Sequence, residues 1–342
     1  MSQPQRGTVT APFFIMGCRR TGTTLVSQIL DSHSRLASYH ESYLYNIFRP
    51  ELHWYGDLAD RRCLDALIAD VRQVIRGQRA EPPGADELAR AIASPTFESV
   101  LAALLQLYAE SRGKMRGGDK TPEHHLYLDE ILAKLPHSPV IFLMRDPRDA
   151  AHSLRRTMDV TLEDGARAWN AALLSLRGAR RPVLLVKYED LVVQPAEHVR
   201  KLCAHLGEAY EEGMLEFFTR IPDRFRNRRG GEKIDKPVDA GAVGGYRRHL
   251  SEREIAVVES MCGEGMDEMG YAFHGAPPAV RGPVGAARTP RAFPILVVER
   301  LRYYGFHWER WRRGMVRWRM MLRARTRYVV RAVLGRMRGP GG

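Results

Sequence analysis

Residues 17–24, GCRRTGTT, combine the residue types that bind an anion. Gly17 and Gly22 bracket a turn that holds two arginines, and two threonines follow at the start of a helix-compatible stretch. Glycines let the backbone approach a ligand, and the first N–H groups of a helix are unpaired donors. We therefore expect a phosphate or phosphate-like group to bind here. The alternative is a strand, a turn and a helix in which the glycines serve packing alone.

The spacing of this turn nearly matches the Walker A loop, G-x-x-x-x-G-K-[ST], but Thr23 stands where that loop has lysine. The Walker lysine neutralises the terminal phosphates of a nucleoside triphosphate. Here the comparable cations are Arg19 and Arg20, which lie inside the turn. This difference favours a nucleotide with a single 5′ group over a magnesium triphosphate.

Glu41 follows residues 36–39, which are predicted to form a second strand. In an open α/β sheet, ligands bind at the carboxyl ends of the strands. Glu41 is therefore a candidate general base toward an acceptor hydroxyl. A solvated glutamate at the start of a helix is the alternative, because geometry decides which carboxylates act as bases.

Lys120 lies in the segment GGDKTPEHH. Thr121 can cap a helix and Pro122 can begin it, so Lys120 would be a fixed cation just outside a helix N-terminus. Such a cation could stabilise developing negative charge. The alternative is a surface lysine in a turn.

Arg145 directly follows the apolar run 140–144, which is predicted to be a buried strand. Ser153 lies eight residues later, about two helical turns into the next helix. Both side chains could reach one phosphate. A nucleoside triphosphatase would have an acidic magnesium ligand at the end of such a strand, so the arginine argues against that class. A salt bridge from Arg145 to Asp146 or Asp149 is the alternative.

The elements that must position these residues follow from short apolar runs and helical periodicity. Strands are predicted at residues 13–16, 36–39, 140–144 and 182–186, and helices after the first turn and at 61–75, 97–111 and 195–206. Ser251 is predicted to cap a further helix that ends near Gly270. Strands that alternate with helices indicate an α/β fold with a parallel sheet.

Four motifs in this order, GCRRTGTT, DKTP, FLMRDPRDAAHS and LLVKYEDLVVQPAEHVRKLCAHLG, resemble the sulfotransferases that use 3′-phosphoadenosine 5′-phosphosulfate (PAPS). The likeness runs from Pro12 to Tyr271 and is greatest to the bacterial and tyrosylprotein branches. It implies a three-layer, P-loop-like α/β fold, with a central parallel sheet flanked by helices.

The resemblance also implies roles for individual residues. The loop positions that match the 5′-phosphosulfate site are Arg20, Thr21, Gly22, Thr23 and Thr24. Arg145 and Ser153 match the residues that hold the 3′-phosphate. Glu41 matches the base of the tyrosylprotein branch, although the segment before it is one residue longer here, and Lys120 matches a lysine that helps to bind the sulfuryl group.

Three further positions are related to the donor by the resemblance. Arg19 stands where the family loop usually has proline, which makes the loop less stiff. Tyr188 matches a tyrosine near the cofactor in some members, with the start of the next helix as its alternative role. Arg247 lies in GYR, which matches a G-x-W-R-like segment that ends a loop over the adenosine.

The composition, 44% hydrophobic and 27% charged residues in a chain of 342, is typical of a globular protein. The four cysteines lie far apart with no C-x-x-C pair, so we expect a reducing compartment and no metal site. We also expect the mature protein to begin near Met1, with no membrane span, and to be cytoplasmic.

The basic excess lies at the C-terminal end. Residues 285–342 hold 15 Arg, no Lys and two Glu, whereas the remaining residues hold 38 basic and 38 acidic groups. We therefore predict a sulfotransferase domain at 1–284 and a basic, amphipathic helical tail at 285–342. Apolar residues recur there at helical spacing. Binding to the inner face of an anionic membrane is the favoured role for the tail, helix pairing in a homo-oligomer comes next, and nucleic acid is least favoured.

The functional prediction is transfer of a sulfuryl group from PAPS to a hydroxyl of an acceptor, a lipid, glycolipid or carbohydrate among the candidates. Glu41 would take the proton, while Arg20 and Lys120 stabilise charge. A P-loop kinase that phosphorylates a small metabolite with Mg-ATP is the alternative. A membrane- or polyanion-binding module with an inactive nucleotide site is a third.

Overall fold

The computed structural model describes residues 11–78, 81–158, 160–220 and 235–275. The chain divides into two compact units. Among the described residues, the first unit comprises 11–43 and 108–275, and the second comprises 44–107. All the candidate site residues lie in the first unit.

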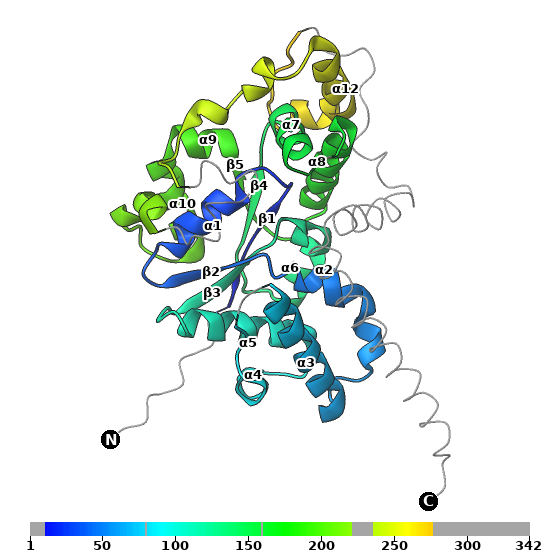
Figure 1. The fold of residues 1–342 in the computed structure, drawn as a ribbon, viewed down its shortest axis with the longest axis vertical. Helices are drawn as coiled ribbons and strands as arrows, with labels where there is room; N and C mark the ends of the chain where they lie inside the picture. The colour runs from blue at the N-terminus through cyan, green and yellow to red at the C-terminus, as the bar shows by residue number, and fades with distance from the viewer. Residues whose placement is uncertain (1–10, 79–80, 159, 221–234, 276–342) are drawn as a thin grey trace, which may run out of the picture. The chain divides into compact units, whose positions relative to one another are not determined.

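A five-stranded parallel sheet forms the centre of the first unit (Figure 1). Its strands are β1 (Phe13–Gly17), β2 (Leu36–His40), β3 (Arg116–Lys120), β4 (Val140–Met144) and β5 (Leu184–Lys187), in the order β2-β3-β1-β4-β5. Gly17 pairs with Leu143, and His40 pairs with Lys120. The carboxyl ends of the strands therefore form one edge, and β1 lies in the middle of it.

Helices cover both faces of this sheet, as Figure 1 shows for α1, α9 and α10 on one side and α7 and α8 on the other. The first unit holds α1 (Thr23–Asp31), α6 (Leu128–Lys134), α7 (Pro147–Met158), α8 (Leu162–Arg177), α9 (Tyr188–Val193), α10 (Pro195–Leu206) and α12 (Glu252–Glu268). Because side chains alternate along a strand, Phe13 and Ile15 of β1 join the core against α1 and α10. The three-layer α/β prediction is confirmed.

Helix ends follow local chemistry that the sequence shows. Ser251 accepts a hydrogen bond from the Glu254 backbone N–H, and the Glu254 carboxylate accepts one from the Ser251 backbone N–H, which makes a capping box at the start of α12. Gly207 ends α10 in the left-handed conformation, with a φ of 72°. Both ends lie where the sequence predicts them.

Strand β3 was missed by the sequence prediction, which placed Lys120 just outside a helix N-terminus and predicted no strand at GGDK. The missing signal is apolar character, because β3 has the sequence RGGDK and yet all five residues are buried. Gly118 explains why glycine is needed there: a Cβ at this position would overlap the Phe13 ring of the neighbouring β1. Gly118 therefore allows close packing of the two strands.

The second unit is helical within the described residues. It contains α2 (Leu44–Phe48), α3 (Arg61–Gly77), α4 (Ala85–Ala91) and most of α5 (Phe97–Glu110). The rings of Tyr45 and Phe97 pack edge to face, with centroids 5.1 Å apart. The predicted helices at 61–75 and 97–111 are confirmed to within two residues.

Short 3₁₀ helices connect these elements. They are η1 (Arg49–Tyr55), η2 (Pro122–Tyr127), η3 (Glu212–Arg220), η4 (Ala240–Ala242) and η5 (Gly245–Arg248). In the described ranges, no helix combines the length and the apolar character that a membrane crossing requires. The four cysteines are buried free thiols. The predicted tail and its boundary at 284/285 lie outside the described residues.

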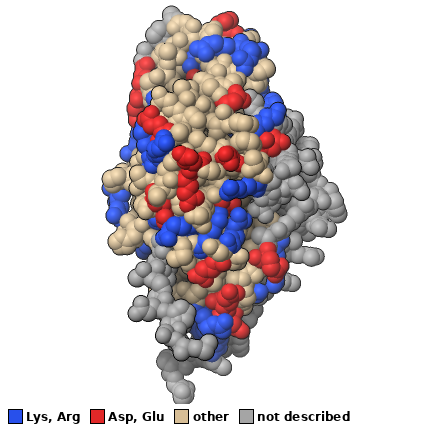
Figure 2. All heavy atoms as spheres, turned by 90° about the vertical axis from the view of Figure 1, so that its left-hand side faces the viewer, with Lys and Arg blue, Asp and Glu red and all other residues tan. Residues whose placement is uncertain are grey.

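Basic and acidic side chains are interspersed on the face of the described residues that Figure 2 shows. This agrees with the equal numbers of basic and acidic groups outside residues 285–342.

Candidate active site

The loop after β1 has the shape of an anion cradle. Gly17 and Gly22 have φ angles of 138° and 92°, which favour glycine, and Gly22 is the N-cap residue of α1. The Thr21 hydroxyl donates a hydrogen bond to the Cys18 carbonyl across the turn, at 2.6 Å. The N-terminal N–H groups of α1 thus lie at the middle of the sheet's carboxyl edge, where an anion is favoured.

Both glycines also have a packing role, so the alternative interpretation was partly right. A Cβ on Gly17 would overlap the Leu143 backbone, and a Cβ on Gly22 would lie 2.7 Å from the Tyr188 ring. Neighbouring residues of the protein therefore already occupy the space that a Cβ would need at either position, so packing alone favours glycine there.

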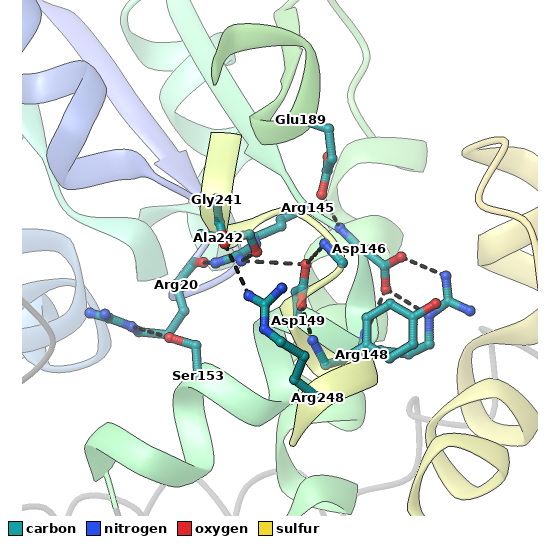
Figure 3. Close-up of polar contacts among 12 residues, drawn as sticks. Arg20, Arg145, Asp146, Arg148, Asp149, Ser153, Glu189, Gly241, Ala242 and Arg248 are labelled. Carbon is teal, nitrogen blue, oxygen red and sulfur yellow. Dashed lines mark hydrogen bonds and ion pairs between the residues drawn. The ribbon is translucent and has the colours of Figure 1, made fainter. Parts of the chain in front are cut away.

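Arg20 joins this loop to the helix after β4, as Figure 3 shows. Its Nε donates a hydrogen bond to Ser153 Oγ at 3.1 Å, and its backbone carbonyl accepts one from Arg145 Nη1 at 3.4 Å. The two segments that the sequence predicted to bind opposite ends of one nucleotide are therefore neighbours. Arg20 has a φ of 67°, an unusual conformation for a residue with a side chain.

Arg145 is buried at the end of β4 and makes several contacts. It forms an ion pair with Asp149 at 3.4 Å, and its guanidinium lies 4.4 Å from the centroid of the Tyr188 ring. The predicted ion pair to Asp149 is thus present, whereas Asp146 pairs with Arg148 instead. The buried Nε of Arg145 has no hydrogen-bond partner among the described residues, so one donor remains for a ligand.

Tyr188 lies at the start of a helix, as one of its two predicted roles requires, and it also contacts Arg145. It begins α9, and its ring stacks on Arg145 beside the loop glycine Gly22. Burial raises the pKa of its hydroxyl, and the positive charge of Arg145 opposes that shift. Tyr188 therefore serves this site as a neutral, flat surface.

Asp149 holds the segment 240–248 next to Arg145 through hydrogen bonds. The sequence analysis did not assign this role. Its carboxylate accepts hydrogen bonds from the backbone N–H groups of Gly244 and Tyr246, both at 2.8 Å. Arg145 Nη2 donates to the Ala242 carbonyl at 2.6 Å (Figure 3). Arg247, the predicted contact of the nucleotide, lies with its guanidinium 4.8 Å from the Tyr246 ring centroid.

Lys120 and Glu41 form a second cluster beside the loop. Lys120 is fully buried, and its Nζ donates to Glu41 Oε1 at 2.6 Å and to Thr24 Oγ1 at 3.2 Å. The surface-lysine alternative is therefore wrong, and so is a helix-start setting for Glu41, whose φ is 58° in the loop before α2. Burial raises the pKa of Glu41, but Lys120, His40 and Arg19 outweigh it and hold that pKa well below its usual value.

Tyr43 completes this cluster and was missed by the sequence analysis. Its hydroxyl donates to Glu41 Oε2 at 2.6 Å, so both carboxylate oxygens of Glu41 are engaged. Arg19 Nη2 donates to Tyr43 Oη at 3.3 Å, and Arg19 also forms an ion pair with Glu123. Arg19 therefore connects the anion loop to the Glu41 cluster.

The buried carboxylate of Asp119 holds the loop that carries Glu41. It accepts hydrogen bonds from the Thr121 hydroxyl at 2.9 Å and from the backbone N–H and hydroxyl of Ser42. Thr121 was predicted to cap a helix through its side chain. The structure corrects this, because its hydroxyl is used by Asp119 and the segment after it is the 3₁₀ helix η2.

The site residues fit the doubly charged donor that the sequence resemblance implies. One candidate anion site is the N-terminus of α1 with its threonines, and the other is Arg145, with its unused Nε, and Ser153. Arg20, which lies in the loop before α1, contacts both Arg145 and Ser153. In the residues that the structure describes, no group of three or more His, Cys, Asp or Glu is arranged to hold a metal ion.

Comparison with known proteins decides the family. The model described as "Sulfotransferase family" matches residues 12–212, more than half of the chain. The chain belongs to the sulfotransferase family. This confirms the resemblance that the four motifs indicate.

The relatives of this sulfotransferase-family chain are distant. It is 26% identical over 293 residues to nodulation protein NoeE of Sinorhizobium fredii, covering 75% of this chain and 65% of that protein. It is 22% identical to protein-tyrosine sulfotransferase of Drosophila melanogaster, covering 78% of this chain and 52% of the relative. The chain thus spans between half and two thirds of these two relatives.

The solved sulfotransferase domain from the curacin biosynthetic pathway has the same fold. It superposes with a TM-score of 0.50 at 17% identity, covering 77% of this chain and 99% of that domain.

Proposed function

We propose that this protein transfers a sulfuryl group from PAPS to the hydroxyl of a small-molecule or lipid acceptor. The observation that carries the proposal is the position of Arg20, which connects the α1 cradle to the Arg145–Ser153 pair. Two anion sites joined by one residue suit a nucleotide that carries a 5′-phosphosulfate and a 3′-phosphate.

The donor would be held by residues of both anion sites. The loop side chains and the first N–H groups of α1 bind the 5′ end, and Arg145 and Ser153 bind the 3′-phosphate. Tyr188 provides a flat surface beside Arg145, and the segment 240–248, which contacts Arg145 and Asp149, borders this region. The bound donor supplies an activated sulfuryl group.

The second cluster would act on the acceptor. Glu41 accepts the proton of the acceptor hydroxyl, and Lys120 and Arg20 stabilise the negative charge on the transferring group. Lys120 already contacts Thr24 at the start of α1, so it lies between the base and the cradle. While Lys120 remains paired with Glu41, the carboxylate is a weak base; a shift of Lys120 toward the sulfuryl group would raise the basicity of Glu41.

Binding of adenosine 3′,5′-bisphosphate, the desulfated donor, to the purified full chain tests the proposal by isothermal titration calorimetry. Arg145→Gln should weaken binding by about tenfold or more, the cost of a charge-assisted hydrogen bond. Arg167→Gln is the matched control, because Arg167 is exposed and pairs with Asp164. Binding of Mg-ATP in place of the bisphosphate would support the small-metabolite kinase instead.

The acceptor, the cytoplasmic location and any contact with the inner face of a membrane belong to the same proposal. Sulfated metabolites of cells with and without the protein, compared by mass spectrometry after labelling with isotopic sulfate, would identify the acceptor class. An unchanged sulfated pool, together with no binding of the bisphosphate, would contradict the sulfotransferase activity.

A further inference from the structure

A pocket of about 430 Å³ lies at the opposite edge of the sheet from the proposed donor site. Its lining includes Arg116, the first residue of β3, the segment 136–139 before β4, and Arg181 and Pro182 before β5. The strands are parallel, so their amino ends form one edge, remote from Gly17 and Lys120 at the carboxyl ends. The C-terminal end of α10 closes one side.

The charged and titratable side chains among the described residues that line this pocket are Arg116, His137, Arg181 and His205, with no aspartate or glutamate among them. Burial lowers the pKa of His205, whose Nε2 lies 3.1 Å from the Val140 carbonyl, so the two arginines supply the fixed positive charge. Glu208, whose charge acts on Arg116, forms an ion pair with Arg35 at 2.9 Å. The chemistry of the lining therefore favours an anion.

Arg116 is held rigidly at the floor of the pocket. The residue is only 7% exposed, and its Nε and Nη1 donate hydrogen bonds to the carbonyls of Ala11 and Leu206, both at 2.7 Å. Within the described part of the chain its Nη2 makes no hydrogen bond. A fixed guanidinium with donors to spare is arranged to bind an oxyanion at low entropic cost.

Ser138 is a second, independent indication of a ligand. It is 6% exposed and lines the pocket, and its buried hydroxyl has no hydrogen-bond partner among the described residues. A buried polar atom without a partner costs free energy, and such atoms are rare in native proteins. An oxyanion in this pocket would accept the hydrogen bond that the hydroxyl can donate.

We infer that this pocket binds a phosphate group, either as inorganic phosphate or as a small phosphate monoester. Arg116 and the Ser138 hydroxyl bind the oxyanion at the floor. The exposed Arg181 adds a second guanidinium at the rim, where its contact to the Leu132 carbonyl is long, at 3.4 Å. The inference is independent of the sulfotransferase activity.

Site-resolved carbethoxylation of histidines tests the inference with inorganic phosphate as the probe. His137 lines the pocket and is exposed, so diethyl pyrocarbonate should modify it in the free protein. Phosphate should slow that modification in a saturable manner, as measured by peptide mass spectrometry. His198 on α10 lies outside the pocket and should react equally with and without phosphate. A titration with glycerol 3-phosphate distinguishes a monoester site from one that takes only the free ion.

Two substitutions test whether the protection of His137 comes from phosphate bound in this pocket. Ser138→Ala and Arg181→Gln together should raise the phosphate concentration for half-protection by about tenfold or more, the loss of a charge-assisted hydrogen bond. Arg180→Gln, an exposed neighbour outside the lining, should leave it unchanged. Absence of protection at His137, or protection that the Ser138→Ala and Arg181→Gln substitutions do not weaken, would overturn the inference.

Discussion

At the scale of single residues, the site depends on an ion pair whose two members are of unequal exposure. Lys120 is fully buried, whereas the Glu41 side chain is 19% exposed. An ammonium group buried without a counter-ion is strongly unfavourable, so Glu41 stabilises the fold as well as its proposed chemistry. A test of Glu41 must therefore separate its two roles.

Glu41→Gln separates them, because the amide oxygen can still accept a hydrogen bond from Lys120. We expect sulfuryl transfer to fall by about 10²- to 10⁴-fold, the usual contribution of a general base. Binding of adenosine 3′,5′-bisphosphate should be retained, as measured by calorimetry. A variant that loses donor binding and transfer together would assign Glu41 a structural role only.

The pH dependence of stability gives a second residue-scale test that needs no acceptor. The pKa of Glu41 is lower in the folded protein than in the unfolded chain. Its ionised form therefore stabilises the fold above the unfolded pKa of about 4.3, and this contribution is lost as pH falls through the folded pKa. Urea unfolding between neutral and acidic pH should show a smaller acid loss for Glu41→Gln than for the wild type. Equal acid losses would contradict the pKa shift.

Sequence reasoning selected Arg20, Lys120 and Glu41 as candidates because the motifs that contain them are local features of the sequence. It did not find Tyr43 or Asp119, whose importance lies in contacts to other segments. Asp119 even belongs to the DKTP motif, but nothing in that motif shows that its carboxylate binds Ser42, 77 residues earlier. Such pairings become visible only when strands β2 and β3 are placed side by side.

At the scale of elements, Asp119 connects the end of β3 to the loop after β2. Asp119→Asn retains one acceptor oxygen but replaces the other by an NH₂ donor. The Asp119 carboxylate accepts from both the Ser42 hydroxyl and the Ser42 backbone N–H, so one of these two donors would lose its acceptor. We expect unfolding free energy to fall by about 1–3 kcal/mol, the cost of unsatisfied buried polar groups. Asp235→Asn, at an exposed position, is the control, and chemical denaturation is the measurement. An unaltered midpoint in both variants would show that the Asp119 contacts do not hold the loop.

The strands also show how far sequence alone determines the fold. β1, β2 and β4 are apolar enough to be predicted to within one residue at each end. The strand predicted at residues 182–186 begins two residues before β5 does. β3 carries Arg, Gly, Gly, Asp and Lys, so its identity as a strand is set by its neighbours on both sides. Gly118 matters because it faces the Phe13 ring, which is a tertiary contact.

Gly118→Ala tests this packing argument. The added Cβ would overlap the Phe13 ring, so we expect destabilisation of about 1–3 kcal/mol from overpacking. Gly275→Ala is the matched control, because nothing lies within 4 Å of its added Cβ. The two variants are compared by urea denaturation, and equal stabilities would show that β3 can move away from β1.

At the scale of the whole molecule, charge separates the chain into a balanced part and a basic end. Residues outside 285–342 carry 38 basic and 38 acidic groups, and the predicted tail carries the net +13. The two parts should therefore respond differently to ionic strength. Donor binding depends on fixed charges in a partly buried site, whereas attraction of the tail to an anionic surface is screened within about 10 Å at 0.1 M salt.

Vesicle sedimentation of the full chain tests the predicted membrane role of the tail. We expect binding to vesicles with anionic lipid, weaker binding at high salt, and little binding to purely zwitterionic vesicles. Deletion of residues 285–342 should abolish vesicle binding but retain binding of adenosine 3′,5′-bisphosphate, because every proposed donor-binding residue precedes residue 285. Circular dichroism must first show that the shortened chain is folded. Equal vesicle binding by both chains would contradict the membrane role, and a concentration-dependent dimer formed by the full chain alone would favour helix pairing instead.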